Sequence, residues 1–154
     1  HKEYRRQRQM CIRDRSKHLK DAADLFKQAT GLTFHAFGAP FNANDDTTMA
    51  ALDAVPEITI WMYGPKSDQK RLVLGRSLNI EIATGKVSYE KFAQDYAAKK
   101  PTGLLLLQGH CGMWDDASFK GFTQAAELLK KDGWTTMTAR QYAERLKAST
   151  GGKK

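Results

Sequence analysis

One histidine stands at the end of the most apolar stretch of the chain, and it is the clearest chemical feature of the sequence. Residues 103–107 read Gly-Leu-Leu-Leu-Leu, and Gln108, Gly109 and His110 follow directly. A short apolar run of this kind is typical of a strand covered on both faces in a parallel sheet. The carboxyl ends of such strands form the rim where α/β proteins place their chemistry, so His110 is the first candidate catalytic residue. The alternative is that this histidine only ends the strand and contacts solvent.

The residues around His110 include two glycines and two large apolar side chains. Gly109 and Gly112 would let the main chain approach a ligand closely. Leu107 and Trp114 are candidates for substrate contact, although a tryptophan here more often packs on the following helix. Asp115 either caps that helix or orients the histidine.

Several other polar positions have a structural explanation that we favour over a site role. His35 alternates with apolar neighbours in a predicted strand, so we expect a partnered core residue. Asp45 or Asp46 is expected to cap a helix. Glu81, a single acid between two isoleucines, is the least favoured of the candidate site residues.

The charge of the chain is concentrated at one end. The 154 residues carry a formal net charge of +8 and are enough for one domain, but too few for two comfortable ones. The first 20 residues hold eight lysines and arginines against two acids, whereas the remaining 134 hold 17 against 15. The body of the chain is therefore nearly neutral, and we expect no nucleic-acid partner. No apolar stretch reaches the length needed to cross a bilayer, so no membrane span is expected.

The two ends of the chain are set apart from its body. Residues 1–15 fit neither a strand nor an amphipathic helix and resemble translated sequencing-adapter read-through, so we expect a disordered or non-native segment. Residues 148–154 are rich in Gly and Lys and are expected to fray. Residues 16–147 form the predicted domain. Cys11 and Cys111 show no metal-binding or redox spacing and do not identify a compartment.

Helical and strand-like segments alternate along the body of the chain. Ser16, Ser88 and Thr138 are expected to cap helices. The expected buried face of the helix over 117–132 consists of Phe119, Phe122, Ala125, Ala126 and Leu129. The alternation predicts an α/β fold with a parallel sheet and right-handed crossovers. The expected helices are 16–31, 45–54, 88–99, 117–132 and 138–147, and the expected strands are 33–37, 58–63, 71–74, 78–82, 103–108 and 134–137.

Three of these stretches together resemble the carboxyl-terminal half of the polysaccharide deacetylase family. They are residues 37–42 (Phe-Gly-Ala-Pro-Phe-Asn) before a helix, the apolar strand ending at Trp61, and residues 106–110 (Leu-Leu-Gln-Gly-His) followed by Trp114. Members of this family are metal-dependent esterases that remove acetyl groups from chitin, peptidoglycan and similar polymers.

The resemblance implies a partial, distorted (β/α) barrel that lacks its amino-terminal strands, and a carbohydrate substrate with acetyl groups. In the family, a divalent metal (zinc or similar) activates water, an aspartate acts as base, and a histidine of the last motif protonates the leaving group. His110 matches that histidine. The residues expected to contact substrate are Pro40, Asn42, Trp61, Leu107 and Trp114.

The sequence also departs from the family pattern. No Asp-Asp pair follows a strand near the amino terminus, and His1, His18, His35 and His110 lack ligand spacing. Gly38 stands where the family has an arginine, and the expected metal ligands are absent.

These departures lead us to expect a hydrolase fragment without its metal centre, inactive as it stands. The alternative is a non-catalytic carbohydrate-binding remnant of the same fold. A nucleic-acid-binding protein with a basic arm ranks last.

Overall fold

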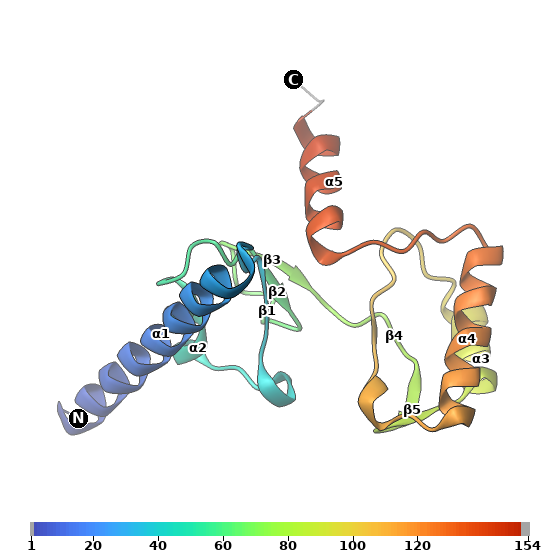
Figure 1. The fold of residues 1–154 in the computed structure, drawn as a ribbon, viewed down its shortest axis with the longest axis horizontal. Coiled ribbons are helices and arrows are strands. Elements are labelled where there is room, and N and C mark those ends of the chain that lie inside the picture. The colour runs from blue at the N-terminus through green and yellow to red at the C-terminus, as the bar shows by residue number, and fades with distance from the viewer. Residues whose placement is uncertain (1, 152–154) are drawn as a thin grey trace. The chain divides into compact units, whose positions relative to one another are not determined.

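The computed structural model describes residues 2–151, with side chains for residues 12–149, as two separate units (Figure 1). Unit 1 contains the chain up to Leu74 and again from Thr138, and unit 2 contains Gly75–Met137. We expected one domain over residues 16–147. The structure differs because the buried apolar side chains gather into two separate cores, one in each unit.

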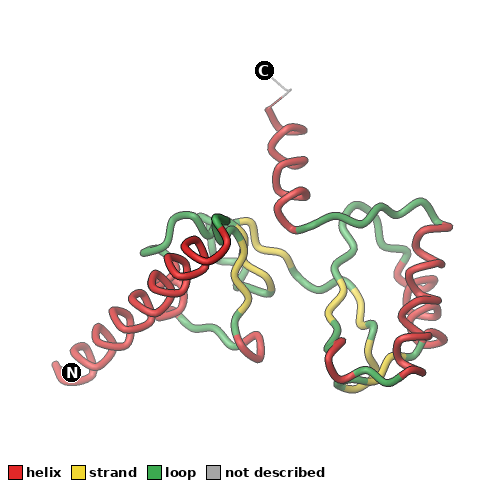
Figure 2. The backbone as a smooth tube through the Cα atoms, viewed as in Figure 1, coloured by secondary structure: helices red, strands yellow, loops and turns green. Residues whose placement is uncertain are grey.

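Unit 1 contains a three-stranded parallel sheet in the order β1-β2-β3, with Phe37 opposite Trp61 and Trp61 opposite Val73. The connection from β1 to β2 passes through a short helix, the usual form of a parallel crossover, whereas the connection from β2 to β3 is a loop. In chain order the elements (Figure 2) are α1 (Lys2–Thr30), β1 (Ala36–Gly38), the 3-10 helix η1 (Pro40–Asn42), α2 (Asp46–Leu52), β2 (Ile60–Met62), β3 (Leu72–Leu74) and α5 (Ala139–Gly151).

The first helix is longer than the sequence predicts. It runs without a break through residues 2–15, where we expected disorder, and ends at Gly31, whose φ is +70°. Arg, Lys, Gln, Glu and Met dominate this segment and are good helix formers, which explains the continuation. Ser16 is not a cap, because its hydroxyl donates to the carbonyl of Ile12 inside the helix. Helix α5 likewise continues to Gly151 where fraying was expected, and residues 152–154 lie outside the described residues.

Trp61 lies at the centre of the unit 1 core. It is completely buried, together with Leu52, Val55 and Ile58. A Cβ on Gly64 would lie 2.4 Å from the Trp61 ring, so the main chain there lies directly against the indole. The predicted substrate contact at Trp61 is therefore replaced by a packing role, since none of its surface is open to a ligand.

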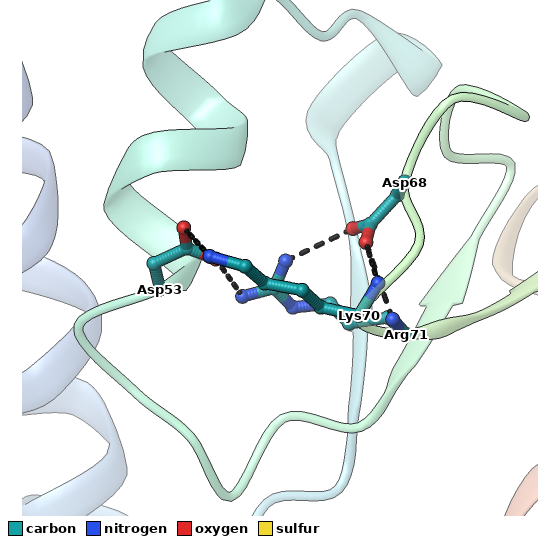
Figure 3. Close-up of polar contacts among 4 residues, drawn as sticks. All are labelled: Asp53, Asp68, Lys70 and Arg71. Atoms are coloured by element: carbon teal, nitrogen blue, oxygen red, sulfur yellow. Dashed lines mark hydrogen bonds and ion pairs between the residues drawn. The ribbon is translucent and has the colours of Figure 1, made fainter.

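A buried ion pair closes the turn between β2 and β3 (Figure 3). The Arg71 guanidinium, 4% exposed, donates to Asp68 over 2.9 Å and to Asp53 over 2.7 Å. Asp68 is 1% exposed and also accepts from the backbone N–H groups of Lys70 and Arg71. Burial raises the pKa of Asp68, but the Arg71 hydrogen bond and the backbone donors outweigh it and lower the pKa. Lys70 reaches Asp53 from the solvent side.

Unit 2 contains one parallel pair of strands and one antiparallel hairpin. Leu78 lies opposite Leu107 in the parallel pair, and the hairpin turns at Gly85, whose φ is +75°. Its elements are β4 (Leu78–Asn79), β5 (Glu81–Ala83), β6 (Lys86–Val87), α3 (Tyr89–Lys99), β7 (Leu107–Gln108), the 3-10 helix η2 (Cys111–Met113) and α4 (Asp116–Lys131). The predicted helix caps Asp45, Ser88, Asp115 and Thr138 are all confirmed.

Strands in unit 2 are shorter than predicted. The expected strand 103–108 is reduced to Leu107–Gln108. The Leu106 N–H donates to the Ser77 hydroxyl, so it makes no hydrogen bond to a neighbouring strand. Residues 134–137 form no strand. Trp134 instead donates its Nε1–H to the Tyr96 hydroxyl, and its backbone N–H to the carbonyl of Leu129.

Helix α4 faces the core with part of the predicted side, since Ala125 is buried and Leu129 packs against the unit 2 core as expected, but the phenylalanines differ. Ser118, Gly121 and Ala125 are buried, whereas Phe119 and Phe122 are 49% and 40% exposed. Gly121 lies so close to Val87 that a Cβ would approach its Cγ1 to 3.1 Å, and Ser118 bonds to the hairpin. Close contact with the hairpin therefore selects the small residues, and this turns the two phenylalanines outward.

The fold class is mixed α/β with small sheets, and residues 2–151 contain no closed barrel. Within that range, no helix combines the length and apolar character needed to cross a bilayer.

Breaking the buried ion pair should destabilise unit 1. Asp68→Asn leaves the buried Arg71 with a single carboxylate, so we expect a loss of about 3 kcal/mol in the free energy of unfolding. Lys70→Ala removes only a solvent-exposed ion pair and should change it by less than about 0.5 kcal/mol. Urea denaturation followed through the Trp61 indole N–H signal measures both. Equal effects of the two substitutions would contradict the assignment.

Candidate active site

A tight turn after β7 places the side chains of His110 and Trp114 in contact with the same acidic residue. His110 precedes η2 and Trp114 follows it, and the turn is closed by hydrogen bonds from the Met113 N–H to the His110 carbonyl and from the Trp114 N–H to the Cys111 carbonyl. Both side chains meet Glu81, the first residue of β5. We call Glu81, His110 and Trp114 the Glu81 cluster.

The Glu81 carboxylate is buried and saturated with donors. Its side chain is 8% exposed. Oε1 accepts from the His110 backbone N–H at 2.6 Å and from Trp114 Nε1 at 2.5 Å, and Oε2 lies 2.7 Å from His110 Nδ1. A backbone hydrogen bond from Gly85 adds a further donor. A buried carboxylate without such partners would be strongly unfavourable, so these bonds hold the turn to the strand.

The donors keep Glu81 ionised. Burial alone raises the pKa of the carboxyl, but the bonds from the His110 backbone, the His110 ring, Trp114 and Gly85 outweigh it and lower the pKa from its ordinary 4.5 to about 2. Glu81 is therefore a carboxylate at neutral pH and can only accept hydrogen bonds.

The ionised acid determines how His110 can act. Nδ1 must carry a proton to donate to the carboxylate, so Nε2 is the ring atom left to gain or release one. No residue in the described range bonds Nε2, and the side chain is 46% exposed. The arrangement is that of an imidazole oriented by a carboxylate and half exposed to solvent, which is a geometry that general acid–base catalysis can use.

Gly109 is required by the tryptophan ring and not by a ligand. A Cβ at this position would lie 2.5 Å from Cζ2 of Trp114, so the indole occupies the space that we expected a ligand to enter. Gly112 has open space around it. Phe119 and Phe122 hold the indole from other directions, with ring centroids 5.3 and 5.1 Å away.

The acid that contacts His110 is Glu81, for which we expected no more than a minor site role. Asp115, weighed as the orienting residue, caps α4 through the Ser118 N–H and pairs with Lys86 instead. Glu81 lies 29 positions before His110, and no local spacing relates them. The available signal was a lone acid in an apolar strand segment, which needs a buried partner.

The predicted contact residues fall in different units. Leu107, His110 and Trp114 belong to unit 2, while Pro40, Asn42 and Trp61 belong to unit 1. Leu107 packs on the unit 2 core. The described site is therefore built from unit 2 alone.

The predicted contact residues of unit 1 other than Trp61 are Pro40 and Asn42, and each has a different environment. Pro40 borders a cavity of about 390 Å³ that is mostly apolar, with Arg15, His18 and Thr48 as its polar groups. Arg15 is already bonded to Asp45 and Thr48. Asn42 is half-buried with a φ of 55°, in the left-handed region. His35 Nδ1 lies 3.3 Å from the Glu57 carbonyl, in keeping with a partnered structural residue.

No set of three or more His, Cys, Asp or Glu side chains in the described part of the chain could hold a metal ion. The Glu81 cluster itself offers one carboxylate and one imidazole, and their facing atoms are already bonded to each other. The described residues therefore do not fit the divalent metal that the family resemblance implies.

Comparison with known proteins gave no match among protein-family models, curated proteins or solved structures.

Two glycines three positions apart test the packing of the tryptophan. Gly109→Ala should displace the Trp114 ring and lower the free energy of unfolding by about 2 kcal/mol, the usual range for an overpacked core. Gly112→Ala meets nothing within 4 Å and should be nearly neutral. Denaturation curves read at the Trp114 indole N–H give both values. A neutral Gly109→Ala would show that the ring does not lie where the structure places it.

Acid should weaken unit 2 through Glu81. Because the folded pKa of Glu81 is depressed, its stabilising effect is complete above pH 4.5 and is lost as the pH falls toward 2. The difference in unfolding free energy between the unmodified chain and Glu81→Gln, on the order of 3 kcal/mol at pH 7, should shrink across this range. Denaturation at a series of pH values measures it. Glu127→Gln, at an exposed position of α4, is the matched control and should show no such convergence.

Proposed function

We propose that this chain is part of a polysaccharide-deacetylase-like hydrolase that cleaves the carbon–nitrogen bond of an N-acetyl group, or an acetyl ester, on a carbohydrate. His110 is the general acid of this reaction. The observation that carries the proposal is the 2.7 Å contact between the Glu81 carboxylate and His110 Nδ1, with the ring left half-exposed. The order of the motifs along the chain agrees with it. The parallel pairing of β1–β3 and of β4 with β7 is in keeping with parts of a (β/α) barrel.

His110 acts on the leaving group. Water adds its oxygen to the acetyl carbonyl carbon and releases one proton to solvent, and the carbon–nitrogen bond then breaks with its electron pair moving to nitrogen. His110 Nε2 gives its proton to that nitrogen, so that the sugar departs as an amine and acetic acid is formed. The acid ionises to acetate, and its proton passes through solvent to restore the one on Nε2. An amide nitrogen leaves poorly without a proton, and a positioned acid lowers this barrier.

Glu81 is a positioning residue for this step. It keeps a proton on Nδ1 and holds the ring plane, so Nε2 remains the atom that exchanges protons with substrate. Its backbone bond to His110 holds the main chain at the same point. Leu107 and Trp114 are proposed to border the acetyl group.

In the family that the sequence resembles, a divalent metal supplies the activated water. The described residues do not form a site for it, so we derive no step through the metal and limit the mechanism to what His110 and Glu81 do.

A non-catalytic carbohydrate-binding role is the second candidate. It is favoured by the half-exposed phenylalanines beside Trp114, which form an aromatic surface that is independent of proton transfer. The two candidates differ in whether the imidazole contacts the acetyl group.

Oligosaccharide titration distinguishes them. With N-acetylglucosamine tetramer, the proposal expects the imidazole NMR signals of His110 to shift, whereas glucosamine tetramer, which lacks acetyl groups, should shift them little. The chain should release no acetate on adding zinc, because no metal cluster lies among the described residues. His35, bonded to a main-chain carbonyl in unit 1, is the control imidazole. Equal shifts with both sugars, or no shift at His110, would contradict the hydrolase proposal.

A further inference from the structure

Unit 1 contains a cavity that the proposed function does not use. It has a volume of about 390 Å³ and is lined by residues of α1, of the segment from β1 to η1, and of α2. Small-molecule sites in proteins occupy roughly 300–1,000 Å³ and combine apolar walls with a few polar groups. The cavity therefore has the volume of a site for a small molecule, near the lower end of that range.

The two ends of the cavity differ in polarity. Arg15 and His18 are exposed and lie about one turn apart on α1, so they stand at its mouth. Ala51 is completely buried and forms part of its floor. The remaining wall is mostly apolar and includes Leu19, Phe37, Pro40 and Ala43. A ligand that fits this shape carries a polar group at one end and an apolar body behind it.

Arg15 is held in place and still has donors to offer. Its Nη1 donates to the Asp45 carboxylate at 2.8 Å and to the Thr48 hydroxyl at 3.0 Å. Among the described residues, nothing accepts from its Nη2 or Nε, and His18 has no hydrogen-bond or ion-pair partner. The guanidinium is thus oriented by α2 while part of its planar donor set faces a ligand, and that geometry matches a carboxylate.

We propose that this cavity binds an apolar monocarboxylate, such as a medium-chain fatty acid or an arylalkanoic acid. The carboxylate accepts hydrogen bonds from Arg15 and His18 at the mouth, and the hydrocarbon body lies along the apolar wall toward Ala51. The inference concerns unit 1 alone and does not depend on the proposed function, whose residues belong to unit 2.

The charges at the mouth favour one negative charge over two or none. The Arg15 cation is already opposed by the Asp45 carboxylate, so a phosphate dianion would be repelled by a nearby like charge. A neutral head group would displace water from the unbonded guanidinium donors without offering a charged acceptor in its place. A single carboxylate avoids both penalties.

Titrations of the full chain test the site. Octanoate and 3-phenylpropionate should shift the imidazole NMR signals of His18, with a dissociation constant on the order of 0.1–1 mM, as expected for a ligand of about ten non-hydrogen atoms. Octanol lacks the charge and acetate lacks the apolar body, so each should bind about tenfold more weakly or less. His35 is outside the cavity lining and bonded to a main-chain carbonyl, which makes it the control imidazole.

Substitutions at the mouth and in the wall test the two halves of the site separately. Arg15→Gln removes the charged donor and should weaken octanoate binding about tenfold. Arg13→Gln, at an exposed arginine of α1 outside the lining, should leave affinity unchanged. Ala43→Phe places a ring in the cavity from its exposed rim and should prevent binding, whereas Ala54→Phe, at an exposed alanine outside the lining, should not. Circular dichroism checks that each variant folds.

The outcomes are independent of those for the hydrolase. No shift of His18 with either carboxylate, octanol or acetate binding as tightly as octanoate, or full affinity in Arg15→Gln or Ala43→Phe would overturn the site. Losses of the same size in the control variants would overturn it as well. The oligosaccharide titration is read at His110 in unit 2, so either proposal can fail while the other stands.

Discussion

A buried carboxylate that must find hydrogen-bond donors organises the second half of this protein. Glu81 stands in a strand beside core residues and has almost no contact with water. An ionised carboxylate in that position is strongly unfavourable unless both of its oxygens accept hydrogen bonds. The turn after β7 supplies three donors. The turn is therefore held against β5, and the His110 ring and the Trp114 indole take their positions as a consequence. The hydrogen bonds that stabilise the buried Glu81 carboxylate are thus the same ones that orient the His110 imidazole.

Each unit contains a buried charge, and the two charges are compensated by different kinds of partner. In unit 1, Arg71 lies between Asp68 and Asp53, so a buried cation is matched by acids and the ion pair closes a loop. In unit 2, N–H donors match a buried anion, and the side chain of one partner, His110, is about half exposed. Of the two arrangements, only the second includes an imidazole that a ligand could reach from solvent. This is the physical ground for placing the candidate chemistry in unit 2.

The match between sequence and structure was closest where the signal is local. The caps at Asp45, Ser88, Asp115 and Thr138 depend on one side chain and the next turn of backbone, and all form. The buried face of α4 was predicted only in part. Ala125 is buried as expected, but hydrophobicity favoured Phe119 and Phe122, while close approach of the hairpin required the small residues Ser118 and Gly121. Residues 134–137 have a strand-like composition but no neighbouring strand to pair with among the described residues.

By itself, the sequence determined that an imidazole would follow an apolar strand, that helices would begin at these caps, and that the fold would mix helices with parallel strands. Each of these follows from the period of side chains or from hydrogen bonds within a few residues. Only the tertiary structure decided which acid meets His110, why Gly109 is a glycine, and which ring atom is left for chemistry. Those answers depend on the burial of Glu81, 29 positions away from His110. Burial and its electrostatic consequences arise only when distant segments come together.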